Sequence, residues 1–274
     1  MKETLWKLFK ETGDINYYLL YIKLKDGEWM KIDVIEGIVI RETNYSESSK
    51  ILNVLTKDRG LIGVMSKGCR NMKNKLRGVS RKLIYGSFHI YYKENGLSTL
   101  IDVDVKNSYN NILSNFDAIT YATYILMLFE QVAKQSNDNS LFDLLRAGLQ
   151  KIDEGFNPLI LTNIMELKCL NYLGVSPSID CCSLCGDDKN ILTLSSDHGG
   201  FICKNCHTIE TVVKPTTIKL IRMFYYVDID KITKLDLKDE SISEINDFID
   251  QYYDKYTGIY LRNKKNLLKV INTV

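Results

Sequence analysis

Short apolar runs separated by turn residues mark the first third of the chain as β-structure. In order, the runs and the turns between them are 35–41, 50–56, Lys57-Asp58-Arg59-Gly60, 61–66, 83–93, Glu94-Asn95-Gly96 and 97–105. Asn-Gly between two apolar runs is a strong hairpin signal, because both residues tolerate a positive φ. About five strands within about seventy residues are typical of a small barrel or sandwich. We therefore predict a compact β-domain over residues 35–108.

Beyond residue 109 the apolar residues recur every three or four positions, which is the period of a helix. The pattern predicts helices over 116–134, 141–152, 218–227 and 242–256, and a final turn near 267–270. A further helix is best delimited, because Asn157 is a good N-cap, Pro158 fits the first turn and Gly174 fits the residue after the end. Its expected buried face is Ile160, Leu161, Ile164, Leu167, Cys169 and Leu170. The sequence thus predicts a helical domain over 109–274.

Residues 1–34 form a separate extension. An amphipathic helix is expected over 3–9, a break at Thr12-Gly13-Asp14, a second helix or strand over 17–22, and a turn at Lys25-Asp26-Gly27. The segment lacks the apolar stretch and cleavage site of a signal peptide. No apolar run in the chain approaches the roughly 20 residues needed to cross a bilayer. These features argue against secretion and membrane insertion, and we expect a cytoplasmic protein.

The distribution of charge is more informative than its sum. Lys and Arg number 36 and Asp and Glu 34, so the net charge of +2 excludes nothing. Between Arg59 and Lys93, however, there is no acidic residue. The basic residues of this stretch are Arg59, Lys67, Arg70, Lys73, Lys75, Arg77, Arg81, Lys82 and Lys93. Such a face suits phosphates, since each neutralised phosphate adds salt-dependent affinity. The alternative is a solvated basic loop without a ligand.

Aromatic residues interleave with the acid-free stretch at Tyr85, Phe88, Tyr91 and Tyr92. Outward rings on a barrel can stack on bases at about 1–3 kcal/mol each. Strand alternation places Tyr85, His89 and Tyr91 on one face and Phe88, Ile90 and Tyr92 on the other. One set must be buried, so at most half of the rings can contact a base.

Five of the seven cysteines lie between residues 181 and 207. Four of them form the pattern C-x2-C-x17-C-x2-C through Cys182, Cys185, Cys203 and Cys206. This spacing is typical of a four-cysteine zinc ribbon, in which four thiolates make a closed, structural tetrahedral site. Gly186 permits the turn after the first pair, and Gly199-Gly200 can turn a hairpin that returns the second. We predict one structural Zn²⁺ on these four residues, in a zinc-ribbon insertion at 181–207.

Other interpretations of the cysteines remain open in the sequence. The pairs could be ordinary buried thiols or include a redox C-x-x-C, although a redox motif does not need the matched second pair. Cys181 is an alternative ligand with a less suitable spacing, and His198 and His207 are further candidates. Some small domains also keep a knuckle shape without metal. Cys69 and Cys169 stand alone, and no chemistry is assigned to them.

Enzyme signatures are missing from the chain. It contains no G-x-x-x-x-G-K-[ST], no G-x-G-x-x-G after a strand and no H-E-x-x-H. With only His89, His198 and His207, the zinc-deaminase arrangement cannot be built. We expect no enzymatic activity, although scattered acid–base pairs are invisible in one sequence.

Several motifs in order resemble the bacterial DNA repair protein family RecO. They are Ile35-Glu36-Gly37-Ile38-Val39-Ile40-Arg41, Tyr45-Ser46-Glu47-Ser48-Ser49-Lys50, Leu55-Thr56-Lys57-Asp58-Arg59-Gly60, Lys67-Gly68-Cys69-Arg70, Gly174-Val175-Ser176-Pro177, Cys182-x-x-Cys185-Gly186 and Gly199-Gly200-Phe201-x-Cys203-x-x-Cys206. The resemblance runs from about residue 35 to near the C-terminus. The extension departs from it, and Trp6, Thr12-Gly13-Asp14 and Tyr18-Leu19-Leu20 instead resemble the small YqzL-like family.

The RecO resemblance implies an α+β, multidomain protein: an N-terminal OB-fold β-barrel, then a helical domain with an inserted four-cysteine zinc knuckle. It also implies binding of single- and double-stranded DNA, annealing of complementary strands, and work with RecR to load RecA on DNA covered by single-strand-binding protein. The protein would then be cytoplasmic and nucleoid-associated. The expected DNA contacts are Arg59, Lys67, Arg70, Lys73, Lys75, Arg77, Arg81 and Lys82. The alternatives are a zinc-ribbon RNA-binding or transcription-associated protein, and an enzyme with an unrecognised site.

Overall fold

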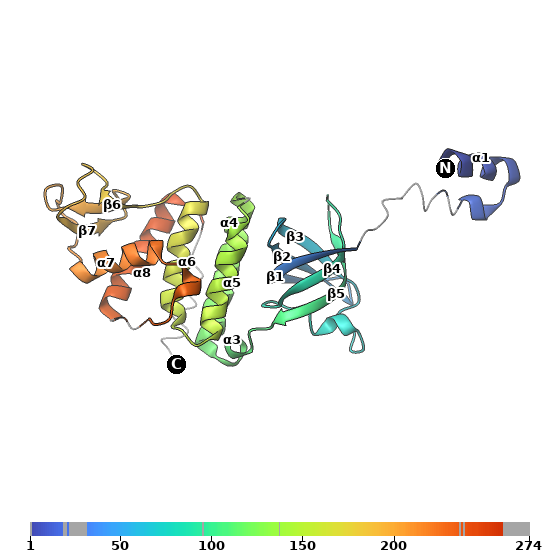
Figure 1. Cartoon of the computed structure of the whole chain (residues 1–274), viewed down its shortest axis with the longest axis horizontal. Helices are drawn as coiled ribbons and strands as arrows, with labels where there is room; N and C mark the ends of the chain where they lie inside the picture. The colour runs from blue at the N-terminus through green and yellow to red at the C-terminus, as the bar shows by residue number, and fades with distance from the viewer. Residues whose placement is uncertain are drawn as a thin grey trace.

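The computed structural model describes residues 2–18, 21, 32–94, 96–136, 138–235, 237 and 239–259. A β-barrel is followed by a helical domain, and a small three-stranded sheet lies at the far end of that domain from the barrel (Figure 1). This is the α+β architecture expected from the sequence. The expected turns at 25–27 and near 267–270, and Leu20, lie outside the described residues.

Five strands close the barrel in the order β1-β2-β3-β5-β4. Their bounds are β1 (Ile32–Tyr45), β2 (Ser49–Thr56), β3 (Gly60–Ser66), β4 (Tyr85–Tyr91) and β5 (Ser98–Asn107). The long β1 pairs with β4 through its first half and with β2 through its second, while β3 runs parallel to β5. This closed topology with one parallel pair is that of an OB fold, and it decides between the barrel and the sandwich.

Both predicted hairpin pairings are antiparallel in the structure, β2 with β3 and β4 with β5. All five strands lie where they were predicted, with ends that differ by up to four residues, and two of these differences are the starts of β1 and β4. Strand β1 begins at Ile32 rather than at residue 35. Strand β4 begins at Tyr85 rather than Leu83, because Leu83 has a φ of 65°, a left-handed conformation that cannot continue a strand.

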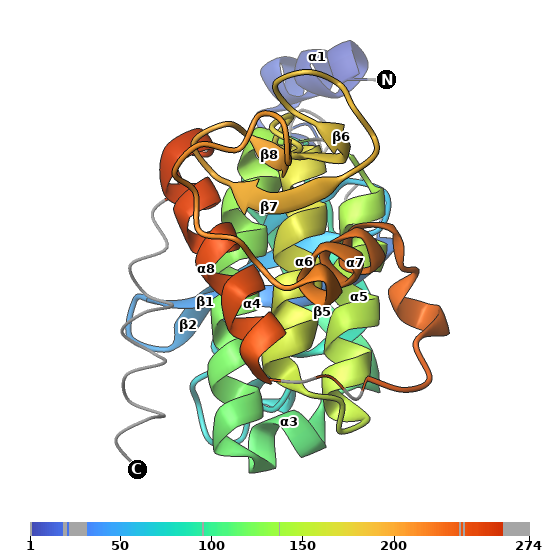
Figure 2. The ribbon, with the colours of Figure 1, turned by 90° about the vertical axis from the view of Figure 1, so that its left-hand side faces the viewer.

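The helical domain is built around one helix that is buried on nearly every side. Its elements are α3 (Asn110–Ser114), α4 (Phe116–Gln135), α5 (Ser140–Asp153), α6 (Pro158–Tyr172), α7 (Pro215–Tyr226) and α8 (Asp239–Tyr256). Figure 2 shows α6 in the middle of the others. All six apolar residues predicted for its buried face are buried, and so are Asn163 and Glu166.

The ends of α6 follow the predicted capping. The Asn157 side chain accepts hydrogen bonds from the backbone N–H groups of Leu159 and Ile160, at 3.0 and 3.3 Å. At the other end, Gly174 has a φ of 71° and donates to the Asn171 carbonyl, while Val175 donates to the Leu170 carbonyl. This pair of bonds is the Schellman motif, in which a left-handed glycine satisfies the last carbonyls of a helix.

The N-terminal extension forms its own small cluster. Helix α1 (Lys2–Thr12) is longer than the predicted 3–9, and the chain breaks at 13–14, within the predicted break. Residues 15–18 are helical, which favours the helix over the strand for the predicted element at 17–22, although residues 19, 20 and 22 lie outside the described chain. The rings of Trp6, Phe9, Tyr18 and Tyr21 pack on one another, with centroids 4.8–6.4 Å apart. The cluster lies apart from the barrel in Figure 1. No helix within the described part of the chain is long and apolar enough to cross a membrane.

A buried carboxylate fastens the barrel to the helical domain. Glu130 on α4 has a side chain only 9% exposed. It accepts hydrogen bonds from Arg41 Nη1 on β1 at 3.2 Å, Asn53 Nδ2 on β2 at 3.1 Å and Lys134 Nζ at 2.9 Å. Around it, Ile38 and Leu55 of the barrel belong to the same apolar core as the helices. Some barrel residues therefore pack in the core of the helical domain, and Glu130 adds a charged contact between the two domains.

We expect Glu130→Gln to lower the free energy of unfolding by about 1–3 kcal/mol, because it weakens a charged hydrogen-bond network at a buried site. Burial raises the pKa of Glu130, but Lys134 and Arg41 outweigh it and hold the pKa below the ordinary 4.5. The stabilisation is thus full above pH 4.5 and is lost as the pH falls towards the lower folded pKa.

Chemical denaturation of the wild type and of Glu130→Gln between pH 7 and pH 3 measures the difference between their free energies of unfolding. The gap between wild type and Glu130→Gln should close as the medium becomes acidic. The exposed Asp188→Asn is the matched control and should show no gap at either pH. A gap that stayed constant across the whole range would contradict the role assigned to the ionised carboxylate.

Candidate nucleic-acid interface and metal centre

The loop that joins β3 to β4 closes one end of the barrel. It runs over 67–84, and its apolar residues Cys69, Leu76 and Ile84 belong to the barrel's interior core together with Phe88. The buried hydroxyls of Ser66 and Ser80 hydrogen-bond at 2.7 Å beside this plug. The lone Cys69 of the sequence is therefore a packing residue. Because the apolar residues are held inside, the charged residues between them must face solvent.

Polar contacts fix the loop against the turn between β1 and β2. Arg70 donates from its backbone N–H to the Ser48 carbonyl at 2.8 Å and from Nη1 to the Ser46 carbonyl at 3.2 Å. The Gly68 N–H donates to Ser49 Oγ at 3.1 Å. Within the loop, Asn74 Oδ1 caps the short 3₁₀ helix η1 (Lys75–Arg77) by accepting from Leu76 N–H at 2.8 Å. The loop thus has one hydrogen-bonded shape. Sequence reasoning missed the contribution of the turn, since no local pattern links positions twenty residues apart.

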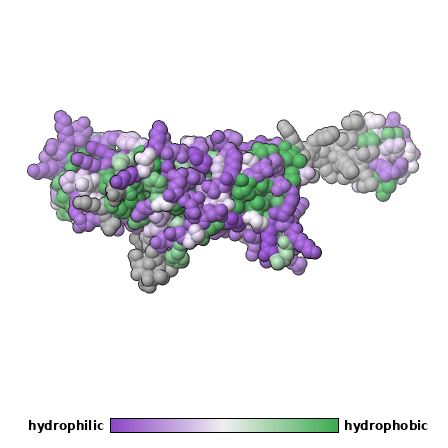
Figure 3. All heavy atoms as spheres, turned by 60° about the horizontal axis from the view of Figure 1, so that its bottom comes forward, coloured by the Kyte–Doolittle hydropathy of each residue, from purple (hydrophilic) through white to green (hydrophobic). Residues whose placement is uncertain are grey.

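The structure exposes most of the basic side chains proposed to meet DNA. Lys67, Arg70, Lys73, Lys75 and Arg77 are exposed on this loop. Arg81 and Lys82 are half-buried and lie in the loop before β4. Figure 3 shows a hydrophilic projection at the lower side of the barrel, where this loop lies. The acid-free sequence therefore becomes an outward-facing surface.

Two of the basic residues are already neutralised by acidic partners. Lys75 Nζ lies 2.6 Å from Asp102 Oδ2, and this hydrogen bond and the charge of Lys75 lower the pKa of Asp102. Arg59, on the turn between β2 and β3, lies 2.8 Å from Asp33 and stacks over the Tyr92 ring at 3.9 Å. The side chains of Lys67 and Lys73, by contrast, form no hydrogen bond or ion pair with a described residue, although the Lys67 carbonyl accepts from Asn74 Nδ2 at 3.2 Å. These two lysines are the most available for a phosphate.

Most of the aromatic rings that the sequence offered as base contacts already pack against other parts of the protein. Phe88 lies inside the barrel, as the alternation allowed. Tyr85 faces outward, but its hydroxyl donates to Glu36 and its ring contacts Phe142 of α5 with centroids 6.2 Å apart. Burial first, and Glu36 next, raise the pKa of Tyr85 to about 12. Tyr92 carries Arg59 on its face. Of the four rings, only the half-buried Tyr91 has neither role within the described chain.

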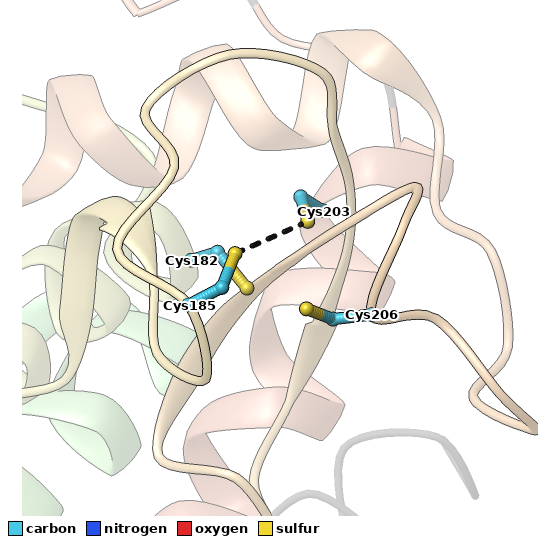
Figure 4. Close-up of side chains that lie close together, drawn as sticks. All are labelled: Cys182, Cys185, Cys203 and Cys206. Carbon is cyan, nitrogen blue, oxygen red and sulfur yellow. Dashed lines mark hydrogen bonds between the residues drawn. The ribbon is translucent and has the colours of Figure 1, made fainter.

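A small sheet brings the two cysteine pairs together. Its strands are β6 (Ser178–Cys182), β7 (Ile191–Ser195) and β8 (Gly200–Cys203), in the order β6-β8-β7. Each pair follows a strand end and forms a tight turn: Gly186 donates to the Cys182 carbonyl at 2.9 Å, and Cys206 donates to the Cys203 carbonyl at 3.1 Å. Gly186 has the expected positive φ, 77°. Figure 4 shows the four side chains converging from these two turns.

The geometry of the four sulfurs suits a metal ion. All four Sγ atoms lie within 4.8 Å of one another, and those of Cys185 and Cys203 are 3.6 Å apart. A tetrahedral ion with thiolate bonds of about 2.3 Å separates its sulfurs by about 3.8 Å. Burial opposes ionisation of Cys182, but N–H groups of Cys203, Cys185 and Leu184 lower its pKa to about 6. Hydrogen bonds with the neighbouring Cys185 and Cys203 thiols, by contrast, raise the pKa of Cys206 to about 12. The case for a metal ion therefore rests on the positions of the sulfurs. The cluster could therefore hold a metal ion on four sulfurs, with no position left open.

The other candidate ligands lie outside this cluster. Cys181 Sγ is 3.7 Å from Ser178 Oγ. His198 Nε2 lies 3.2 Å from the Glu210 carboxylate, and His207 Nε2 donates to the Glu210 carbonyl at 2.8 Å. Cys169 is fully buried on α6, as predicted. The arrangement favours the matched pairs over isolated buried thiols.

We expect Gly200→Ala to disrupt the metal centre. A Cβ at Gly200 would lie 2.2 Å from the Ser178 carbonyl oxygen and 2.7 Å from its nitrogen, so β6 and β8 could not stay paired. The two cysteine pairs would separate, and the metal bound per chain after dialysis should fall well below that of wild type.

Gly199→Ala is the matched control for this prediction. Gly199 also has a positive φ, 76°, but its Cβ would meet only the Tyr256 hydroxyl at an ordinary 3.6 Å. Its cost should be limited to left-handed strain of about 1–2 kcal/mol, with metal retained. Equal metal content in both variants would show that the close contact of β6 and β8 does not hold the centre together.

Comparison with known proteins identifies relatives of the whole barrel and helical domain. Two family models match, "Recombination protein O N terminal" over residues 30–109 and "Recombination protein O C terminal" over residues 113–265. The DNA repair protein RecO of Bacillus pumilus is 34% identical over 234 residues, which cover 84% of this chain and 91% of that protein. That of Listeria monocytogenes serotype 4a is 35% identical over 234 residues, 84% and 91%. That of Bacillus subtilis is 34% identical over 236 residues, 85% and 92%.

Proposed function

The chain belongs to the recombination protein O (RecO) family, and from that premise we propose that it acts in recombinational DNA repair by binding DNA and annealing complementary single strands. The observation that carries this proposal is the acid-free loop, which presents exposed Lys67 and Lys73 on a frame fixed to the barrel. OB-fold barrels commonly bind nucleic acid through their surface loops.

The proposed chemistry is electrostatic and non-catalytic. Two complementary strands repel one another through their phosphates, and a basic surface that holds one strand lowers that repulsion. The bases then select the partner by pairing, so the protein itself needs little sequence preference. No covalent bond is made or broken in this scheme, which agrees with the absence of enzyme motifs from the sequence.

The proposal extends to partners through the family resemblance. In that scheme the protein works with RecR at DNA in the cytoplasm, helps RecA to displace single-strand-binding protein, and binds both single- and double-stranded DNA. The barrel loop supports the DNA part of this scheme. The partner surfaces rest on family membership alone.

We further propose that the metal is one structural Zn²⁺ on Cys182, Cys185, Cys203 and Cys206. Four thiolates in a closed tetrahedral set are the preferred environment of zinc. When bound, the ion would supply folding free energy to the knuckle, because its ligands come from two turns that the unfolded chain does not hold together.

Lys67→Ala combined with Lys73→Ala should weaken DNA binding irrespective of base sequence. If each lysine neutralises one phosphate of a single strand, the slope of log K against log salt should flatten by up to about 1.4. Fluorescence anisotropy with labelled single strands at several salt concentrations measures both quantities. Lys189→Ala with Lys219→Ala, two exposed lysines outside the barrel, is the matched control. An unchanged affinity and slope in the loop variant would remove the loop from the interface.

Strand annealing tests the function itself. We expect the wild-type protein to accelerate pairing of complementary single strands covered by single-strand-binding protein, and the Lys67/Lys73 double variant to be slower because less phosphate charge is neutralised. A fluorophore and quencher on the two strands report the rate, and non-complementary strands are the control. An annealing rate equal to that without protein would contradict the proposed function.

Elemental analysis tests the zinc assignment. Purified protein should contain about one zinc per chain, because the four sulfurs form a single site. Cys203→Ser should lose zinc and melt at a lower temperature, whereas Cys181→Ser should keep both, since Cys181 lies outside the cluster. Zinc well below one per chain in the wild-type protein, or loss on changing Cys181, would refute this ligand set.

A further inference from the structure

The turn between β1 and β2 and the acid-free loop form one hydrogen-bonded unit. Three contacts join them: Arg70 N–H to the Ser48 carbonyl, Arg70 Nη1 to the Ser46 carbonyl, and Gly68 N–H to Ser49 Oγ. The turn begins at Tyr45, whose strand pairing with Ser49 is the last of the hairpin. Tyr45 is therefore held at the same end of the barrel as the basic loop.

Two exposed apolar side chains stand on this unit. Tyr45 is 48% exposed and Met72 is 82% exposed. Among the described residues, the Tyr45 side chain takes part in no hydrogen bond or ring contact, and the Met72 sulfur meets only the Arg77 guanidinium as a polar partner. Single exposed apolar residues are common and need no explanation. These two, however, lie on segments that Arg70 joins by hydrogen bonds: Tyr45 begins the turn, and Met72 lies on the loop between Lys67 and Lys73.

We propose that Tyr45 and Met72 contact the bases of the strand whose phosphates lie on Lys67 and Lys73. The inference rests on the proposed DNA-binding function and adds a second kind of contact to it. A nucleobase has two flat apolar faces, so the Tyr45 ring can stack on one and the Met72 side chain can pack on another. Both contacts tolerate every base, as an annealing protein requires.

The charges around the turn and the loop determine where the phosphates and the bases of a bound DNA strand would lie. Glu47, on the turn next to Tyr45, is exposed and would repel phosphates, whereas Glu42 is neutralised by Lys50 at 2.6 Å. The backbone of the strand must then follow the loop side, over Lys67 and Lys73, with its bases turned towards Tyr45. Only unpaired bases expose their faces, so these contacts favour single-stranded over double-stranded DNA.

Affinity for single-stranded and duplex DNA, each measured over a salt series, tests the proposal. Tyr45→Ala should weaken single-strand binding about fivefold or more, while leaving duplex binding and the salt slope unchanged. Tyr45→Phe keeps the ring and should bind like wild type. Met72→Ala should weaken single-strand binding in the same selective manner. Tyr226→Ala is the control, since Tyr226 is 60% exposed on α7, far along the chain from the barrel.

These measurements distinguish a failure of the proposed base contacts from a failure of the proposed DNA binding itself. If Tyr45→Ala and Met72→Ala bind single strands like wild type while the Lys67/Lys73 variant loses affinity and slope, the base contacts are wrong and the phosphate site stands. Equal losses for single strands and duplex, or a loss that Tyr45→Phe does not restore, would also overturn base stacking. If the lysine variant too is unaffected, the DNA site of the proposed function falls as well.

Discussion

Burial of the loop's own apolar residues is the constraint on which the surface proposed to bind DNA depends. Cys69, Leu76 and Ile84 fill the open end of the barrel, and the lysines and arginines between them are thereby turned outward. A loop without these buried residues would have to order its backbone on binding, at a cost of roughly 1–2 kcal/mol per residue. Here the loop backbone is ordered when the barrel folds, and only the exposed basic side chains remain to be ordered by a ligand. The same segment thus fills the barrel core and carries the basic side chains proposed to bind DNA.

The helical domain contacts the barrel on one side and the four-cysteine knuckle on the other. Near the barrel, Glu130 accepts hydrogen bonds from Arg41 and Asn53. Helix α5 also covers Tyr85 of the barrel, so DNA cannot bind to that face. At the far end, Arg222 of α7 donates to the Ile179 carbonyl at 2.8 Å and lies over the Phe201 ring. The knuckle is therefore braced by α7. A metal ion there would hold the knuckle's two turns together, far from the DNA surface proposed for the barrel (Figure 1).

The sequence predicted the structural features that depend on neighbouring residues better than those that depend on contacts between distant residues. The hairpin turns, the Asn157 and Gly174 caps, the alternation along 85–92 and the two cysteine pairs all depend on residues close together in the chain, whereas the sequence does not decide which face of that strand is buried. By contrast, Leu83 has a left-handed conformation and donates a backbone hydrogen bond to Val39 of β1. The residues next to Leu83 in the sequence give no sign of this distant partner. The same holds for the bonds of Arg70 to the turn at 46–48, and so for the position of Tyr45. Charge alone marked the loop, but only the fold shows that Lys75 and Arg59 are paired while Lys67 and Lys73 are exposed.

Amide hydrogen exchange with and without a single-stranded oligonucleotide tests the central claim most directly, because it locates the bound strand along the whole chain in one measurement. The account predicts slower exchange at the turn 45–49 and the loop 67–82, with the knuckle at 181–207 unchanged. Slower exchange confined to the helical domain or the knuckle, with the barrel loop unaffected, would contradict it.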